Sequence, residues 1–442
     1  MSDPDPAVDL SPRLADALAA ALGPVRIDGL RLLTGGASRE TWSFDALRAD
    51  GTRTPLILQR ERGGASQSGP PFPVEDRLLA AAARAGVPIP EVVADAARCA
   101  ALGDARVTRR IDGESLGPKI VRTDGFAPAR ARLPAQLGAA LAVIHSIDPD
   151  EVPGLAAVDA VEQLRTGLDL LGIVSPAFEL ALRWLDDHRP PAGPPTVVHG
   201  DLRVGNLLVD PEDGLLAVLD WELAHVGDPI EDLGWLCVRA WRFGGTGLVG
   251  GVGELDELLD AYRAASGRTV TEDHVRWWLV AGTLRWGMIC SVQAHRHLDG
   301  HVRSVELATI GRRLAENEHD LLDLLNVAPL PADRPLPVVD HGRPTAAELV
   351  SAVRDHLADR VAPALAAGDA FTLRVVRNAL AMVERELAAT PSPAIEVDDA
   401  ALAARVRTGE ELPPADLADL RAAVEARLAV ANPRWSTPPT PP

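Results

Sequence analysis

The stretch His199-Gly200-Asp201-Leu202-Arg203-Val204-Gly205-Asn206, followed by Leu219-Asp220-Trp221-Glu222, decides the fold. Asp201 supplies a carboxylate that can orient a hydroxyl group. Asn206 and Asp220 supply an amide oxygen and a second carboxylate, and Mg²⁺ prefers hard oxygen ligands of this kind. Each residue alone would also fit a loop that bonds its own backbone. The ordered set instead indicates a catalytic carboxylate beside a metal site.

The residues between the two motifs predict a β-hairpin. Leu207-Leu208-Val209 reads as a short strand, Asp210 to Gly214 as a turn, and Leu215 to Leu219 as the returning strand. Such a hairpin brings Asn206, just before its first strand, beside Asp220, just after its second. We therefore expect the two metal-binding residues to lie together.

The composition limits the class of protein. A chain of 442 residues, 47% of them hydrophobic, is long enough for two or three domains with a substantial core. The formal net charge of −19 argues against a nucleic-acid-binding surface. The three cysteines are far apart and lack metal-type spacing, which fits a reducing compartment. No secretory signal is visible, and arginines interrupt the most apolar helix candidate, so we expect a cytoplasmic protein without a membrane partner.

A small, sheet-rich lobe is predicted for residues 25–112, after a helical extension over residues 1–24. The expected strands are Leu30–Leu33, Trp42–Phe44 and Pro55–Arg60, followed by the helix Val74–Ala85. The run Val107–Gly113 reads as a further strand that continues into a connector, which suits a hinge between lobes. The turn between the first two strands contains Gly35, Gly36 and Ser38. A glycine turn at this point lets backbone N–H groups approach a phosphate, although it also fits an ordinary hairpin turn.

Helices are predicted to dominate residues 113–329. The expected helices are Leu133–Ile147, Leu255–Ala265, Val275–Val292 and Val302–Leu325. The glycine-rich stretch Phe243–Gly253 contains no Gly-Lys-Ser/Thr, so it is not a Walker-type phosphate loop. Two interpretations of this stretch stay open, a mobile flap over a substrate pocket and a long surface loop.

The remaining residues predict a linker and a small helical module. Residues 330–344 are rich in proline, as linkers are. Helical periodicity then runs through Thr345–Leu387 and Ala400–Val430, within a module over residues 345–432. Residues 433–442 read as a disordered Pro/Thr tail. The module contains no constellation of residues typical of catalysis.

These motifs resemble those of the aminoglycoside phosphotransferase and choline-kinase-like superfamily, over residues 25–327. The matching elements are His199–Asn206, Leu219–Glu222, Gly227-Asp228-Pro229 and Asp232-Leu233. A narrower similarity, to bacterial phosphotransferases like the kinase-like domains of some acyl-CoA dehydrogenases, rests on Trp221–His225 and Arg239–Gly244. The terminal module resembles an uncharacterised helical domain that follows such phosphotransferases.

The resemblance implies an α+β, bilobal protein-kinase-like fold: a small sheet-rich N-lobe, a mainly helical C-lobe and a small all-α C-terminal module. It also implies that the chain binds ATP and Mg²⁺ and moves the γ-phosphate to a hydroxyl of a small molecule. Asp201 would accept the hydroxyl proton, and Arg203, unless it is an ordinary surface arginine, would contact the phosphate. Asn206 and Asp220 would hold Mg²⁺. The implied nucleotide-binding residues are Gly35, Gly36, Ser38, Arg60, Glu75, Thr108 and Arg109.

The minor motif residues have simpler interpretations. His199 is expected to brace the catalytic loop instead of shuttling protons. Asp228 and Asp232 flank Pro229 at an expected helix start, and we favour their interpretation as caps or loop braces.

One part of the implied N-lobe is replaced. A strand lysine paired with a helix glutamate is expected near Leu58-Gln59-Arg60, but no lysine is there and Lys119 is misplaced. Glu75 fits the helix glutamate, so Arg60 or, less favoured, Gln59 would take the place of the lysine. Strand alternation sends these two side chains to opposite faces, so only one can point into the cleft.

Three functions therefore stay open on the sequence. The first is a phosphotransferase whose acceptor is a hydroxyacyl thioester or a related metabolite. The second is a phosphotransferase for an aminoglycoside or another amino sugar. The third is a nucleotide-binding pseudokinase that acts as an interaction module, which the missing lysine favours and the intact Asp201, Asn206 and Asp220 oppose.

Overall fold

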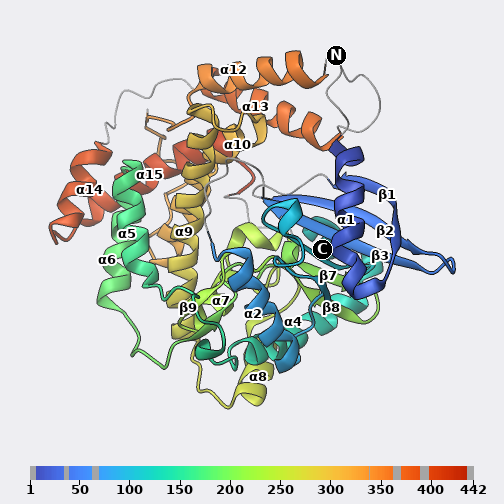
Figure 1. The fold of residues 1–442 in the computed structure, drawn as a ribbon. Helices are drawn as coiled ribbons and strands as arrows, with labels where there is room; N and C mark the ends of the chain where they lie inside the picture. The colour runs from blue at the N-terminus through green and yellow to red at the C-terminus, as the bar shows by residue number, and fades with distance from the viewer. Residues whose placement is uncertain are drawn as a thin grey trace. The chain divides into compact units, whose positions relative to one another are not determined.

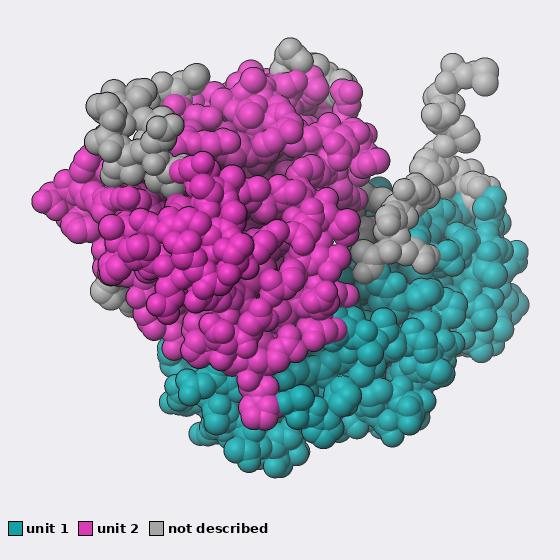
Figure 2. Space-filling model, turned by 90° about the vertical axis from the view of Figure 1, so that its left-hand side faces the viewer, with its two compact units in different colours: residues 1–158, 192–275 teal, residues 159–191, 276–442 magenta. Residues whose placement is uncertain are grey.

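The computed structural model describes residues 6–33, 39–61, 69–337, 339–361, 370–388 and 398–435. Spatial contacts divide the chain into two compact units, shown in different colours in Figure 2. The first unit comprises residues 1–158 and 192–275, and the second comprises residues 159–191 and 276–442. The N-terminal sheet and the motif residues from His199 to Glu222 thus belong to the same unit.

A five-stranded antiparallel sheet forms the N-terminal part of the first unit (Figure 1). Its strands, in spatial order, are β1 (Val25–Leu33), β2 (Arg39–Arg48), β3 (Arg53–Glu61), β5 (Ala105–Arg109) and β4 (Val92–Ala94). The structure confirms the four predicted strands. It adds β4, whose three residues are too few to show an alternating pattern.

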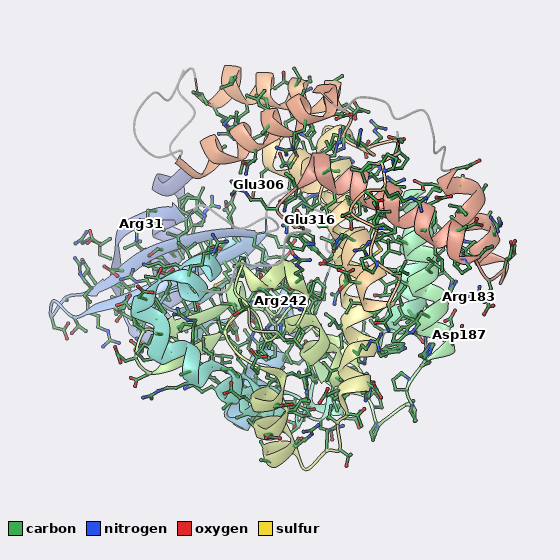
Figure 3. All side chains as sticks on the ribbon, turned by 180° about the vertical axis from the view of Figure 1, so that it is seen from behind. Arg31, Arg183, Asp187, Arg242, Glu306 and Glu316 are labelled. Carbon is green, nitrogen blue, oxygen red and sulfur yellow. The ribbon has the colours of Figure 1, made fainter. Side chains whose placement is uncertain are left out.

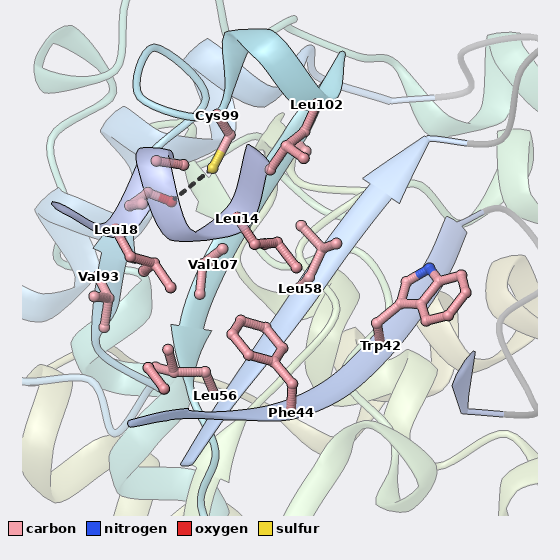
Figure 4. Close-up of a cluster of buried hydrophobic side chains, with 14 of the residues drawn as sticks. Leu14, Leu18, Trp42, Phe44, Leu56, Leu58, Val93, Cys99, Leu102 and Val107 are labelled. Carbon is pink, nitrogen blue, oxygen red and sulfur yellow. Dashed lines mark hydrogen bonds between the residues drawn. The ribbon is translucent and has the colours of Figure 1, made fainter. Parts of the chain in front are cut away.

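One face of this sheet packs against helix α1 (Pro6–Leu22). Leu14 and Leu18 are one helical turn apart, so both point at the sheet, where they meet Phe44 of β2 and Leu58 of β3 (Figure 4). Cys99 completes this cluster of buried side chains. Full burial of a leucine or phenylalanine side chain stabilises a fold by about 1.5–3 kcal/mol. The helix expected near the N-terminus is therefore part of the core of the sheet.

Short helices fill most of the rest of the first unit. They are α2 (Phe72–Ala85), η1 (Ala100–Leu102), α3 (Gly117–Arg122), η2 (Asp124–Phe126), α4 (Ala127–Ile144), η3 (Pro149–Glu151), η4 (Val204–Asn206), α7 (Ile230–Leu236), η5 (Arg239–Arg242) and α8 (Leu255–Ser266). Helices α4 and α8 approach closely at Gly138, where a Cβ atom would lie 2.4 Å from the backbone oxygen of Leu258. Only glycine permits this approach.

Two antiparallel strand pairs surround the motif residues. Strands β7 (Leu207–Asp210) and β8 (Gly214–Val218) form the predicted hairpin. Gly214 begins β8 with φ of 85°, a left-handed conformation that glycine adopts without strain. Strand β6 (Thr196–Val198) pairs with β9 (His225–Gly227). The catalytic motif therefore starts at the end of β6 and finishes at the start of β7.

The second unit is built from helices in its described residues. They are α5 (Ala160–Leu171), α6 (Pro176–Asp187), most of α9 (Glu272–Leu298), α10 (Val305–Gly311), α11 (Leu314–Leu324), α12 (Ala346–His356), the π-helical turn η6 (Leu357–Val361), α13 (Ala370–Ala388), α14 (Asp399–Arg407) and α15 (Pro414–Ala431). The single helix predicted over Val302–Leu325 is two helices, because the chain turns just after Gly311, which packs against Ala294. Within the described ranges, no helix has the length and apolar character needed to cross a membrane.

The helices of the expected C-terminal module pack on helices that precede the linker. Helix α14 lies against α6, and α15 lies against α11. The run of polar residues 316–320 on α11 is buried, although such a run usually faces water. Asn432 donates to Glu316, which Figure 3 labels, at 2.8 Å, and Trp435 donates to Asp320 at 2.9 Å. These contacts pair polar groups that burial would otherwise destabilise.

His319 lies in the middle of this buried polar face. Its Nε2 atom is 3.1 Å from Glu425 on α15, and its Nδ1 atom is 3.5 Å from Asp323. Burial and the nearby Arg421 lower the pKa of His319, but hydrogen bonds to Asp320 and Glu425 outweigh them and raise it to about 9. The imidazole contacts Asp323 of α11 and Glu425 of α15, so it helps to join the two helices.

We expect the stability of the chain to fall at alkaline pH because of His319. The folded pKa lies above the unfolded value of about 6.5, so the stabilisation is complete below pH 6.5 and is lost as pH rises through 9. Urea unfolding followed by circular dichroism should give a lower free energy of unfolding at pH 9.5 than at pH 7. The fall should be smaller in His319→Gln, and an equal fall in both proteins would contradict the assignment.

Candidate active site

A buried carboxylate holds the loop that follows β6. Asp232 of α7 accepts hydrogen bonds from the backbone N–H groups of His199 and Gly200, each at 2.8 Å. Its Oδ2 atom also lies 3.0 Å from Nε2 of His145, the residue directly after α4, whose Nδ1 lies 3.0 Å from the hydroxyl of Tyr262 on α8. Burial raises the pKa of Asp232, but the hydrogen bond with His145 and its other partners bring it below the ordinary value. Asp232 is thus a loop brace, as the favoured interpretation expected.

His199 connects the two motif segments. Its Nε2 atom lies 3.0 Å from the carbonyl oxygen of Leu219, and its Nδ1 accepts the backbone N–H of Asp201 at 3.2 Å. Burial lowers the pKa of His199, which favours a neutral ring that donates from Nε2 and accepts at Nδ1. His199 therefore braces the loop, as predicted.

Gly200, the next residue, must be a glycine. Its φ is 77°, and a Cβ atom there would lie 2.3 Å from the carbonyl oxygen of Leu223. The backbone turns at this point to direct Asp201 toward its partners.

Three side chains hold the carboxylate of Asp201. The indole Nε1 of Trp235 donates to Oδ1 at 2.9 Å, and the amide of Asn206 donates to Oδ2 at 2.6 Å. Nε of Arg203 lies 3.2 Å and 3.3 Å from the two oxygens. A carboxylate with a fixed orientation and spare lone pairs can accept a proton from a hydroxyl group.

The hairpin brings Asn206 and Asp220 together, as the sequence predicted. The N–H of Leu219 donates to the backbone oxygen of Asn206 at 2.8 Å, which pairs the two segments directly before Asp220. The amide nitrogen of Asn206 donates to the backbone and carboxylate oxygens of Asp201 at 2.8 Å and 2.6 Å. Since both amide hydrogens are used, Oδ1 is the atom through which Asn206 can bind a cation.

Asp220 adopts a strained backbone conformation. Its φ is 66°, in the left-handed region, which costs a residue with a Cβ atom about 1–2 kcal/mol. Strain of this kind persists where the surrounding contacts determine the conformation, and it is frequent at functional sites. The strained residue is the one that the sequence predicts to be a metal-binding carboxylate.

Negative charge is concentrated around Asp220. Burial, followed by repulsion from Glu222 and Asp201, raises the pKa of Asp220 to about 7, although Arg203 and Arg39 act in the opposite direction. A divalent cation would remove this repulsion. One amide oxygen and neighbouring carboxylates form a donor set that suits Mg²⁺. The residues present therefore fit a magnesium ion.

The helix glutamate pairs with two arginines, neither of which is Arg60. Arg39, the first residue of β2, binds both carboxylate oxygens of Glu75 at 3.1 Å and 2.7 Å. Arg106 of β5 reaches one of these oxygens at 2.5 Å. Arg60 instead binds Glu40, with its Nη2 atom 2.6 Å from the carboxylate. The expectation that Arg60 takes the place of the lysine beside Glu75 is corrected.

The pleat of the sheet explains this difference. Arg60 and Leu58 share the face that packs against α1. Gln59 lies on the opposite face, in register with Arg106 of β5, and so shares the face of Glu75. The less favoured alternative, Gln59, therefore lies on the face of the sheet where the strand lysine was expected. The positive charges that pair with Glu75 come instead from Arg39 of β2 and Arg106 of β5.

Arg39 connects the sheet, α2 and the segment Leu219–Glu222. Its Nε atom lies 3.7 Å from Glu222, and its guanidinium covers the ring of Phe72 with 4.3 Å between Cζ and the ring centroid. Only 9% of its side chain is exposed. Arg106 is more deeply buried and also pairs with Asp76 at 3.0 Å, so it acts as a structural partner of α2. Sequence reasoning missed Arg39, because only the strand register reveals which residues face Glu75.

The remaining predicted nucleotide-binding residues are divided. Thr108 is buried on β5 opposite Ile57, on the face of the sheet that carries Arg106. Arg109, the next residue on β5, is on the opposite face from Thr108 and pairs with Glu91 at 2.5 Å. Three of the predicted residues lie outside the described residues: Gly35, Gly36 and Ser38.

The glycine-rich stretch Phe243–Gly253 is a partly buried loop of the first unit, and its interpretations as a flap or as a surface loop stay predictions. Val249 and Gly250 are buried, and the N–H of Gly250 donates to the carbonyl oxygen of Leu236 at 3.1 Å. A Cβ atom on Gly250 would lie 2.6 Å from the side chain of Val204. The glycines therefore allow this segment to press against the catalytic loop at η4.

Comparison with protein families gives two matches. A model described as "Phosphotransferase enzyme family" matches residues 29–278, more than half of the chain. A second, described as "Domain of unknown function (DUF6285)", matches residues 363–435. The first match contains all the side chains that surround Asp201, Asp220 and Glu75.

Individual proteins agree with the first match. Acyl-CoA dehydrogenase family member 10 of Mus musculus is 30% identical over 198 residues, which are 41% of this chain and 18% of that protein. Acyl-CoA dehydrogenase family member 11 of Gallus gallus is 29% identical over 164 residues, which are 33% of this chain and 21% of that protein. This chain thus spans about a fifth of the length of these relatives.

A solved structure shows the same fold. A candidate aminoglycoside phosphotransferase from Ralstonia eutropha is 20% identical, with a TM-score of 0.55, and the match covers 71% of this chain and 98% of that one. The α+β kinase-like fold implied by the motifs is confirmed.

Proposed function

Because this chain belongs to the phosphotransferase enzyme family, we propose that it transfers the γ-phosphate of ATP, with Mg²⁺, to a hydroxyl group of a small molecule. One observation carries the proposal: the amide of Asn206 donates to the carboxylate of Asp201, and the buried carboxylate of Asp220 lies close enough to Asp201 for their charges to repel. These residues would supply both parts of the chemistry, a proton acceptor and a metal site.

Asp201 would act as the base. Its carboxylate would accept the proton as the acceptor hydroxyl attacks phosphorus, and its donors Trp235 and Asn206 keep it aligned without reorientation. A positioned general base contributes about 10²–10⁴ to the rate. Arg203, whose guanidinium covers the ring of Trp241 at 4.9 Å, is suitably charged to contact phosphate oxygens.

Asn206 and Asp220 would hold Mg²⁺, with Glu222 adding negative charge nearby. When bound, Mg²⁺ neutralises the triphosphate charge that opposes attack by the acceptor. The raised pKa of Asp220 supports this role, because repulsion between carboxylates is relieved by a cation.

We further propose that Arg39 has the role expected of the strand lysine. It is supported by the bidentate pair with Glu75 and by the 3.7 Å distance from its Nε to Glu222. A guanidinium group is always charged and can grip two phosphate oxygens. Arg106 would keep Glu75 in place while Arg39 contacts the nucleotide.

For the acceptor, we propose a hydroxyacyl thioester or a related metabolite. The similarity to acyl-CoA dehydrogenase family members supports this class, within the region that aligns. An amino sugar is the alternative, to which the net charge of −19 lends mild support. A pseudokinase is favoured by the missing lysine and disfavoured by the pairing of Arg39 with Glu75.

A turnover assay tests the proposed function. Consumption of ATP is measured with and without Mg²⁺ in the presence of hydroxyacyl thioesters, sugars and aminoglycosides. We expect Mg²⁺-dependent transfer to a hydroxyl group within one of these classes. Nucleotide binding without turnover on any acceptor, unaltered by Asp201→Asn, would establish the pseudokinase instead.

Arg39→Ala is expected to weaken binding of Mg²⁺ and a non-hydrolysable ATP analogue about ten- to a hundredfold, since it removes charge-assisted contacts. Arg39→Lys should recover part of the affinity because it restores the charge. Isothermal titration calorimetry measures both. The matched control is Arg60→Ala on the opposite face of the sheet, which should bind normally. If Arg60→Ala is the weaker binder, the assignment of Arg39 is wrong.

A further inference from the structure

We infer that Trp235 is a positioning residue, whose indole N–H holds the carboxylate of Asp201 in the orientation that accepts the hydroxyl proton. The inference rests on the proposed function. It starts from the 2.9 Å hydrogen bond between Nε1 of Trp235 and Oδ1 of Asp201.

One face of α7 controls both the backbone and the side chain of the catalytic loop. Asp232 and Trp235 are three residues apart, so they lie on the same side of the helix. Asp232 fixes the backbone N–H groups of His199 and Gly200, and Trp235 fixes the side chain of the next residue, Asp201. A single helical turn thus determines where the base lies and which way its oxygens point.

The indole ring is itself held in place. Trp235 is 2% exposed, and its ring contacts that of Trp241 with 5.2 Å between centroids. Trp241 in turn lies under the guanidinium of Arg203 at 4.9 Å. Because the ring is fixed, its N–H can fix the carboxylate, since a donor orients an acceptor only when its own rotamer is locked.

Tryptophan suits this position chemically. The indole nitrogen donates a hydrogen bond and cannot accept one, so it cannot take the proton that Asp201 must receive. The other two donors, Asn206 and Arg203, have further proposed roles at the metal and the phosphate. Trp235 is the donor to which no such role is assigned.

Trp235→Phe tests the inference, because phenylalanine keeps an aromatic ring and removes the N–H. Hydrolysis of Mg²⁺–ATP, with water as the acceptor, is measured together with transfer to any acceptor found in the turnover assay. We expect kcat to fall about ten- to a hundredfold, the range for a hydrogen bond to a charged group, with KM for ATP within about twofold. In an Asp201→Asn background the same substitution should cause no further loss.

Trp278→Phe is the matched control for the loss of ring volume. Trp278 is also buried, at 6% exposure, and its indole nitrogen has no hydrogen-bond partner among the described residues. This control should keep the kcat of the unchanged protein. Equal losses of kcat in the two variants, or a loss in Trp235→Phe that appears only in KM, would overturn the inference.

A spectroscopic measurement tests the contact without turnover. The chain contains nine tryptophans, and labelling their indole nitrogens with ¹⁵N gives one N–H signal for each. The signal absent from Trp235→Phe identifies this residue, and it should move upfield in Asp201→Ala while the signals of distant tryptophans stay in place. An unmoved signal overturns the inference. Absence of turnover in the unchanged protein would overturn only the proposed function.

Discussion

Asp201→Asn is expected to lower kcat by about 10²–10⁴ while leaving the affinity for Mg²⁺ and a non-hydrolysable ATP analogue within about twofold. The amide has nearly the same size as the carboxylate but cannot accept the hydroxyl proton. The amide oxygen of asparagine can still accept the hydrogen bond from Trp235, which keeps the side chain in place. Steady-state kinetics and calorimetry separate the two effects.

Asp213→Asn is the matched control for this experiment. Asp213 is an exposed residue in the turn of the same hairpin, so the substitution should leave kcat unchanged. A loss of nucleotide affinity that equals the loss of kcat in Asp201→Asn would show that Asp201 binds the nucleotide instead of accepting a proton.

Asp220→Asn is expected to have two opposite effects. It should weaken Mg²⁺-dependent nucleotide binding by more than about tenfold, the loss seen when even an indirect partner of a metal ligand is removed. It should also stabilise the metal-free protein, because burial, followed by repulsion from Glu222 and Asp201, disfavours the ionised carboxylate of Asp220 and raises its pKa to about 7. The carboxylate of Asp220 is thus expected to be needed for metal binding and to lower the stability of the metal-free protein.

The stabilisation by Asp220→Asn should depend on pH. A carboxylate whose pKa is raised in the folded protein contributes stability that is complete below its unfolded pKa, about 3.9, and is lost as pH rises through 7. The advantage of asparagine should therefore be clearly smaller at pH 5 than at pH 8. Thermal unfolding in EDTA at the two pH values measures it.

Addition of Mg²⁺ and nucleotide supplies the internal control. At pH 8 these ligands should raise the unfolding temperature of the unchanged protein and have little effect on Asp220→Asn. A variant that is less stable than the unchanged protein at pH 8 in EDTA would contradict the electrostatic account. Glu222→Gln removes the other charge of the repelling pair Asp220 and Glu222. It should therefore also stabilise the metal-free protein.

The core of the site could be predicted from the sequence because its geometry is local. A hairpin of fixed length separates Asn206 from Asp220, and strand pairing leaves them one possible relative position. The brace role of Asp232 followed from its place at a helix start. Its specific partners, the N–H groups of His199 and Gly200, required the fold.

The partner of Glu75 could not be predicted in the same way. Arg39, Arg60 and Arg106 are all arginines on neighbouring strands, and alternation within one strand does not reveal how its register matches the next. The structure places Arg60 on the face toward α1 and brings Arg39 and Arg106 to Glu75. A β-sheet contact between residues far apart in the chain is set by register, which a single sequence does not contain.

Two further features depend on contacts between distant parts of the chain. The polar run on α11 reads as a solvent-facing surface until α15, more than ninety residues later, covers it. The bond between Trp235 and Asp201 had a possible signal, the three-residue spacing from Asp232 to Trp235. That spacing also fits a helix that simply buries an aromatic ring, so it carried no functional meaning alone.

The hydrogen bonds from Tyr262 through His145 to Asp232 affect which positions tolerate substitution. They run from α8 through α4 to the backbone of the catalytic loop. A random mutagenesis screen for inactive variants should therefore recover residues of α4 and α8 as well as residues of the loop. Such variants would fail in growth selections although they change none of the reacting groups. Genetic data alone would therefore assign residues of these helices to the active site.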